Sequence, residues 1–121
     1  MPDPLPLEID TLHGDDAYVI RVQGELDLAS CPEFDCALMN AEKSRASRIV
    51  VDLEELTFID SSGLRALLTA SRRSASNGNR LQMTRGKGYP AEMFRLTAFD
   101  QTLPLIHPSF CPAIAGSSYS S

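Results

Sequence analysis

The sequence predicts an α/β fold, a mixed β-sheet with helices packed on it. Two apolar segments separated by a turn sequence near the start indicate an antiparallel strand pair. Helical and strand patterns then alternate along the chain, which is typical of α/β proteins. The predicted order is β-β-α-β-α-β-α-β with a short C-terminal turn. A length of 121 residues suits a single domain spanning 1–121. Its core is expected at about 5–107, with loose termini at 1–4 and 116–121.

Three segments predict the first strands of the sheet. Residues 7–12, "LEIDTL", and 17–24, "AYVIRVQG", flank the turn sequence "HGDD" and predict the antiparallel pair. The short Ile/Val run at 47–53, "SRIVVDL", is typical of a strand covered on both faces.

The first helix is predicted over 30–41, "SCPEFDCALMNA". Ser30 can cap it, Pro32 lies in the first turn, and Glu33 completes an S-x-x-E capping box. An apolar face at helical spacing would pack on the sheet, and it comprises Phe34, Ala37, Leu38 and Ala41.

The second half of the chain continues the alternation. A second helix is predicted to start at "DSSG" (60–63) and to end near Gly78, and a strand follows at 80–84. Pro90 opens a third helix at 90–99. The chain then continues with a strand at 103–106 and one or two helical turns in 108–115. Because proline cannot donate a ladder hydrogen bond, Pro104 confines the last strand to a sheet edge or a strand start.

Two loops are expected to lie on one edge of the sheet. A strand–helix–strand crossover makes the strands at 17–24 and 47–53 parallel. The loops that follow them, 24–30 and 54–63, then leave the same edge, where open α/β sheets engage ligands and partners. Between them these loops present Glu25, Asp27 and Asp60 beside Ser61 and Ser62.

Charge and hydropathy exclude several classes of protein. The net charge of −5 and a pI near 4.9 disfavour nucleic acid, which clustered Lys and Arg recognise, and favour a basic or cationic-edged protein partner. No apolar run approaches the length of a membrane span, so no membrane partner is expected. The first ten residues, "MPDPLPLEID", do not resemble a secretory signal, so the expected compartment is the cytoplasm.

The cysteines predict neither disulfides nor a metal site. Cys31, Cys36 and Cys111 are odd in number, widely spread and without a C-x-x-C pair. We therefore expect partly buried thiols in a reducing compartment, and no metal or cofactor.

The "DSSG" at 60–63 offers more capping side chains than one helix start needs. An Asp or Ser N-cap stabilises a helix by about 1 kcal/mol, which accounts for one of the three. Gly63 in the first turn costs about 0.5–1 kcal/mol relative to alanine. One expectation is that its missing side chain lets a large partner approach the backbone.

Enzymatic interpretations find weaker support in the residues. A serine hydrolase needs a base and an oxyanion hole, but no G-x-S-x-G motif is present, and His13 and His107 have the surroundings of surface residues. No phosphate-binding glycine motif occurs, and "RGKGYP" at 85–90 is interpreted as a solvated turn. The carboxylates of Asp27 and Asp60 lack an evident apolar pocket for acid–base chemistry.

Covalent modification is the third chemical interpretation. A serine hydroxyl at an exposed helix N-terminus is within reach of a kinase. The phosphate adds about −1.5 to −2 charges near unpaired N–H groups and a favourable dipole, so the fold should tolerate it. A partner docked on the same edge should not.

Three stretches resemble the STAS domain family, in particular the bacterial anti-sigma factor antagonists of sporulation and general-stress partner switching. They are "VQGELD" (22–27), "VVDLEELTFIDSSGLRALL" (50–68) and "FRLTAFDQTLPL" (94–105). The resemblance extends roughly from Leu7 to Ile106, and "IDSSGL" is its most specific part. The family usually closes with a longer amphipathic helix, for which Pro112 and the Ser-rich tail leave no room.

The resemblance implies a non-enzymatic, partner-switching regulator with no catalytic residues. Such proteins bind an anti-sigma factor that is also a serine kinase and thereby free the sigma factor. The kinase phosphorylates the first serine after the Asp, here Ser61, and a metal-dependent serine phosphatase restores the binding form. The implied docking surface comprises Glu25, Asp27, Asp60, Ser62 and Gly63. Alternatives are a STAS subunit of a lipid-transport or stress-sensing assembly, and a small hydrolase or nucleotide-binding protein.

Overall fold

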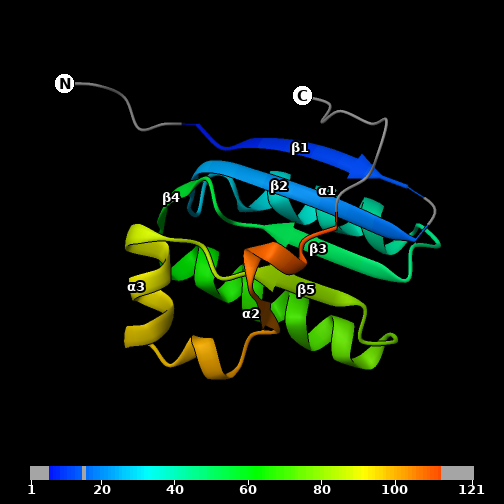
Figure 1. Ribbon diagram of the computed structural model, residues 1–121. Coiled ribbons are helices and arrows are strands. Elements are labelled where there is room, and N and C mark those ends of the chain that lie inside the picture. The colour runs from blue at the N-terminus through cyan, green and yellow to red at the C-terminus, as the bar shows by residue number, and fades with distance from the viewer. Residues whose placement is uncertain (1–5, 15, 113–121) are drawn as a thin grey trace.

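The computed structural model describes residues 6–14 and 16–112 and places three helices and two 3₁₀ turns around a mixed β-sheet (Figure 1). In chain order the elements are β1 (Glu8–His13), β2 (Ala17–Leu26), α1 (Cys31–Glu42), β3 (Arg48–Asp52), β4 (Leu56–Ile59), α2 (Ser61–Ser76), β5 (Leu81–Thr84), α3 (Gly88–Leu96), η1 (Phe99–Gln101), β6 (Leu105–Ile106) and η2 (Pro108–Phe110). The predicted loose termini, 1–4 and 116–121, lie outside the described residues.

The sheet has the predicted mixed topology. Its strand order is β1-β2-β3-β5-β6, with β1 antiparallel to β2 and the remaining neighbours parallel. The predicted crossover from β2 to β3 through α1 is therefore confirmed. Among the described strands, β6 lies at the edge and pairs with β5 only, which agrees with the position that Pro104 imposes.

The strand β4 was not predicted, so the expectation that 54–63 is wholly a loop is wrong. Its residues pair in parallel with the last part of β2, beyond the stretch that pairs with β3. The change of partner coincides with a register shift at Gly24, whose φ of 93° is a left-handed conformation that glycine adopts without strain. The hydroxyl of Thr57 donates to the Gly24 carbonyl oxygen at 2.9 Å and supports this bulge.

Helices α1 and α2 pack against one face of the sheet and enclose the main core (Figure 1). From the strands the core takes Ile20, Val22, Leu26, Ile49, Val51, Leu81 and Met83, and from the helices Phe34, Leu38, Ala41, Leu64, Leu67, Ala70 and Phe94. Of the apolar face predicted for α1, only Ala37 is partly exposed. A smaller cluster of Leu12, Val19 and Val50 forms a second core with partly buried Ile106 and Cys111.

The third helix begins two residues before the predicted start. Pro90 is buried in its first turn, a position where its missing N–H costs nothing. After β6 the chain makes the single 3₁₀ turn η2, and the guanidinium of Arg48 donates to the Phe110 carbonyl oxygen at 3.1 Å. Residues 113–115 of the predicted final turns lie outside the described residues.

Candidate functional site

The two loops that sequence topology placed on one sheet edge are joined directly. The backbone N–H of Asp60 donates to the Leu26 carbonyl oxygen at 3.2 Å. The backbone N–H of Leu28 donates to Oδ2 of Asp60 at 3.3 Å. The turn after β2 and the start of α2 are therefore neighbours, as predicted.

Asp60 is the residue that caps α2. Its backbone is extended, with φ −105° and ψ −174°, and its Oδ1 accepts a hydrogen bond from the Gly63 N–H at 2.9 Å. Its carbonyl oxygen accepts from the Leu64 N–H at 2.9 Å. Because Asp60 supplies the cap, the helix start needs neither of the two hydroxyls that follow, of which Ser61 is exposed and Ser62 is half-buried.

Gly63 is required by close packing inside the protein. A Cβ built on it would lie 2.6 Å from the Leu26 carbonyl oxygen and 2.7 Å from Cγ1 of Ile59. The space beside Gly63 is therefore filled by β2 and β4, and the residue is buried. The expectation that its missing side chain opens the backbone to a partner is wrong, because the chain itself makes the close approach.

A capping box precedes α1, three residues earlier than predicted. Oδ1 of Asp27 accepts from the Ser30 N–H at 3.0 Å, and Oγ of Ser30 accepts from the Asp27 N–H at 2.9 Å. Ser30 is at the N-cap position but has a helical backbone and makes no side-chain capping bond to the helix. The predicted box between Ser30 and Glu33 is therefore wrong, and its place is taken by the reciprocal pair of Asp27 and Ser30.

Glu25 lies at the same end of β2 but on the other side of the strand. Successive strand residues point to opposite faces, so Glu25 points away from the core residue Leu26. It is in register with Phe58 of β4, whose ring stacks on Tyr89 of α3 at a centroid distance of 5.2 Å. The structure thus groups Asp27, Asp60, Ser61 and Ser62 and separates Glu25 from them.

A groove between α1 and α2 adjoins this group. It has a volume of about 270 Å³ and is lined by Leu28, Cys31, Asp35, Ser62, Arg65, Ala66, Thr69 and Arg73. The side chain of Leu28 is 74% exposed, although it is apolar. Burial raises the pKa of the Cys31 thiol, and the nearby carboxylates of Asp35, Asp60 and Asp27 raise it further.

The predicted site omitted Leu28 and Arg65. The available signals were an apolar residue in a polar turn, and an arginine in a helix whose sixteen residues include no Asp or Glu. Neither signal is specific without the groove that joins them.

The two histidines lie away from these serines. His13 is exposed at the end of β1, opposite the start of β2, where its ring stacks on Tyr18 at 5.1 Å. His107 is exposed after the edge strand β6, and its Nδ1 accepts from the Ser109 N–H. Within 6–14 and 16–112 neither histidine is hydrogen-bonded to Ser61 or Ser62.

Of the predicted solvated turn at 85–90, residues 88–90 instead form the first turn of α3. The loop before that helix is held by the protein itself, because the Gly86 N–H donates to Oε2 of Glu54 at 2.7 Å. Among the described residues there is no group of three or more His, Cys, Asp and Glu side chains arranged to hold a metal ion.

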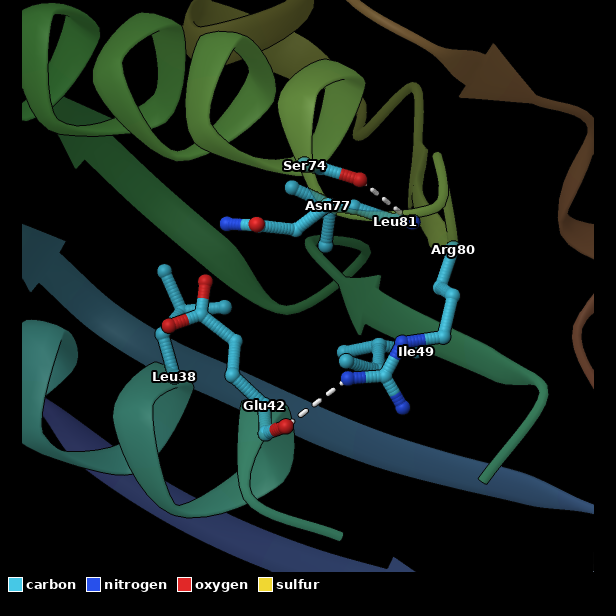
Figure 2. A pocket seen from close by; sticks show the side chains of 7 residues that line it. All are labelled: Leu38, Glu42, Ile49, Ser74, Asn77, Arg80 and Leu81. Atoms are coloured by element: carbon cyan, nitrogen blue, oxygen red, sulfur yellow. Dashed lines mark hydrogen bonds between the residues drawn. The ribbon is translucent and has the colours of Figure 1, made fainter. Parts of the chain in front are cut away.

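A second hollow lies near the C-terminal ends of α1 and α2 (Figure 2). Its volume is about 280 Å³, and it is lined by Leu38, Glu42, Ile49, Ser74, Asn77, Arg80 and Leu81. Its polar groups already serve the fold. Arg80 donates to the carbonyl oxygens of Glu42 at 2.8 Å and Ala46 at 2.6 Å, and Oγ of Ser74 accepts from the Leu81 N–H at 3.0 Å.

Comparison with protein families identifies the fold family. A family model described as "Mlab, STAS domain" matches residues 9–107, and this range includes β2, β4 and α2, the strands and the helix of the site. The chain belongs to the STAS domain family. The resemblance in "IDSSGL" is thereby confirmed at the level of the family.

Curated relatives of this STAS domain are named anti-sigma-B factor antagonists. An anti-sigma-B factor antagonist of Staphylococcus epidermidis is 34% identical over 58 residues, which are 48% of this chain and 54% of the relative. The chain therefore matches about half the length of these relatives.

Solved structures support the same fold. An anti-sigma factor antagonist from Mycobacterium paratuberculosis superposes with a TM-score of 0.75 at 22% identity, covering 91% of this chain and 92% of the other. The anti-sigma factor antagonist SpoIIAA in its unphosphorylated form gives 0.64 at 21% identity, covering 84% and 87%. The Bacillus SpoIIAA in its phosphorylated form gives 0.62 at 19% identity, covering 84% and 90%.

Among the residues that the structure describes, no helix has both the length and the apolar character to cross a membrane.

Proposed function

We propose that this STAS domain is an anti-sigma factor antagonist. It binds an anti-sigma factor that has serine kinase activity, and this binding releases a sigma factor. The observation that carries the proposal is the exposed hydroxyl of Ser61 at the first position of α2, beside a turn that Asp60 ties to the same edge. The names of the curated relatives and structural neighbours support the same function.

Phosphorylation of Ser61 is the proposed off-switch. The fold tolerates the modification because Asp60 caps α2 and Ser61 contributes no capping bond. The phosphate adds about −1.5 to −2 charges to an edge that already holds the carboxylates of Asp27 and Asp60. A partner shaped for the neutral hydroxyl must then bury or repel that charge. A serine phosphatase returns the domain to its binding form.

The proposed docking surface comprises the turn 27–30 and the first turn of α2. Asp27 and Asp60 hold its two parts in place through their capping bonds. Ser61 and Ser62 supply hydroxyls. Gly63 contributes from beneath by allowing α2 to approach β2. Glu25 supports this surface from its backbone, because its carbonyl oxygen accepts from the Ser30 hydroxyl at 3.1 Å and helps to hold the turn in place.

Mass spectrometry after incubation with candidate anti-sigma kinases and ATP tests this function. Wild-type protein and Ser62→Ala are expected to gain one phosphate, located on Ser61, and Ser61→Ala is expected to gain none. Binding of each product to the same anti-sigma factor is then measured by titration, and the phosphorylated forms should not bind.

Three outcomes of these experiments would contradict the proposed function or the assignment of Ser61 as its switch. Labelling of Ser62 in place of Ser61 contradicts the assignment of the switch. Equal binding of modified and unmodified protein favours a STAS subunit of a lipid-transport or stress-sensing assembly, in which Ser61 has no switching role. Turnover of an ester or a nucleotide by the pure protein favours the enzymatic class.

A further inference from the structure

Helix α2 carries cations without acidic partners of its own. Its sixteen residues include Arg65, Arg72 and Arg73 and no Asp or Glu, although the whole chain has a net charge of −5. Arg73 is paired across the helix interface, with its Nε 2.8 Å from Oε2 of Glu42 of α1. Within the described residues the guanidinium of Arg65 makes no ion pair or hydrogen bond, and the side chain is exposed at the rim of the groove.

Arg65 follows Ser61 by four residues, so the two lie one above the other on the helix surface. The Cα–Cβ bonds of an α-helix tilt toward its N-terminus, which directs the Arg65 side chain back over the turn that holds Ser61. An anion placed four residues before a cation is the favourable order for such a pair.

Two of the first backbone N–H groups of α2 are already bonded to Asp60, so those of Ser61 and Ser62 remain for a phosphate. The Gly63 N–H is bonded to Oδ1 of Asp60 and the Leu64 N–H to its carbonyl oxygen. The carboxylate of Asp60 also lies at this end, as do Asp27 and the Asp35 side chain across the groove. A doubly charged phosphate on Ser61 therefore joins three carboxylates, and a cation from a side chain offsets part of their repulsion.

We propose that Arg65 is the internal counter-ion of the phosphorylated switch and forms a charge-assisted hydrogen bond with the phosphate on Ser61. The inference rests on the proposed function, since that function names Ser61 as the modified residue. Guanidinium groups bind phosphate oxygens through paired N–H donors, so the pair is chemically matched. In the unmodified protein Arg65 lines the groove, and in the modified protein the phosphate holds it at the start of α2.

The test uses full-length protein with phosphoserine incorporated at position 61 during synthesis, which removes any need for a kinase. The second ionisation of the phosphate is followed by ³¹P NMR as a function of pH at about 0.15 M salt. A nearby cation favours the dianion and lowers this pKa. In Arg65→Gln the pKa is therefore expected to rise by about 0.3–0.5 unit relative to the wild-type sequence.

Arg72→Gln is the matched control, because it removes the same charge from an exposed position on the same face of the same helix. Arg72 lies eleven residues from Ser61, about 16 Å along the axis and beyond a Debye length of about 8 Å. Its substitution is expected to leave the phosphate pKa unchanged. Arg65→Lys keeps a cation in reach and is expected to recover most of the shift.

A phosphate pKa that is the same in Arg65→Gln and wild type overturns the pairing. An equal rise in Arg72→Gln overturns it too, since the effect would then be one of net charge. A lysine variant that behaves like the glutamine variant also contradicts it. These outcomes are independent of whether a kinase modifies Ser61, which the labelling experiment decides separately. Circular dichroism of each variant checks that the domain is folded.

Discussion

Oδ2 of Asp60 accepts a hydrogen bond from the backbone N–H of Leu28 at 3.3 Å, so one carboxylate joins segments that are 32 residues apart. Its other oxygen caps α2 through the Gly63 N–H at 2.9 Å. The carboxylate therefore couples the helix that begins with Ser61 to the turn that holds Leu28 out into solvent.

Two substitutions of Asp60 should separate these roles. Asparagine keeps one acceptor for the cap, but its amide nitrogen cannot accept from Leu28. We expect Asp60→Asn to retain nearly all of the unfolding free energy and to exchange its Leu28 amide proton faster. Asp60→Ala loses both bonds and should be destabilised by about 1–2 kcal/mol. Urea denaturation and amide hydrogen exchange measure the two effects. Equal stability of the alanine variant and wild type would contradict the capping role.

Gly63→Ala should destabilise the domain even though alanine is the better helix former. The helix preference favours alanine by about 1 kcal/mol. The added Cβ, however, would lie 2.6 Å from the Leu26 carbonyl oxygen and 2.7 Å from Ile59 Cγ1. Overpacking of this kind costs about 1–3 kcal/mol or more, which outweighs the helix preference. We expect a net loss, seen as a lower urea midpoint. Ser62→Ala is the neighbouring control and should change the midpoint little. A more stable Gly63→Ala variant would disprove the close approach.

The two Ser61 variants should separate folding from binding. Ser61→Ala removes the phosphate acceptor and no capping bond, so its stability should change by less than about 1 kcal/mol. It should bind the anti-sigma kinase persistently. Ser61→Asp adds a charge that the helix dipole favours, so it should stay folded. In the interface that charge lies beside Asp60 in a surface shaped for a neutral hydroxyl, and we expect at least about a tenfold loss of affinity, because 1.4 kcal/mol corresponds to that factor. Calorimetric unfolding and a binding titration check both, and wild-type affinity in Ser61→Asp would refute the switch.

The thiols should be dispensable and unequal in reactivity. All three are free, Cys36 is exposed, and burial together with nearby carboxylates raises the pKa of Cys31. A raised pKa leaves less thiolate at a given pH, so iodoacetamide should modify Cys36 faster than Cys31. Replacement of all three by serine should leave partner binding intact. Redox-dependent binding that disappears in this triple variant would show a role for the thiols.

Chain order alone predicted the relation between the two loops of the site. The crossover rule makes β2 and β3 parallel, so the segments that follow them leave one edge of the sheet. That rule depends only on the sequence of strand and helix patterns, which strong apolar periodicity makes visible. The exposed position of Ser61 followed from the same argument, because a helix that starts at this edge has its first turn at the surface.

Sequence spacing gave a wrong prediction at Ser30, because two possible hydrogen-bond partners compete for its side chain. The S-x-x-E spacing correctly predicted a helix start at Ser30 but assigned the wrong capping box. Oγ of Ser30 bonds to Asp27 and Glu25, residues that β2 brings to it. A spacing rule counts candidates along the chain and cannot weigh a partner supplied by the preceding strand.

The sequence by itself determined the fold class, the order of most strands and helices, and the place of Ser61. Only the tertiary structure decided that β4 is a strand and that Gly63 is a packing requirement. The strand β4 has four residues with no strict alternation of buried and exposed side chains. It forms because the last residues of β2, after the bulge at Gly24, are available to pair with it. Gly63 is needed because Leu26 and Ile59 occupy the space of a Cβ. Both features come from contacts between segments distant in the chain, which no local pattern records.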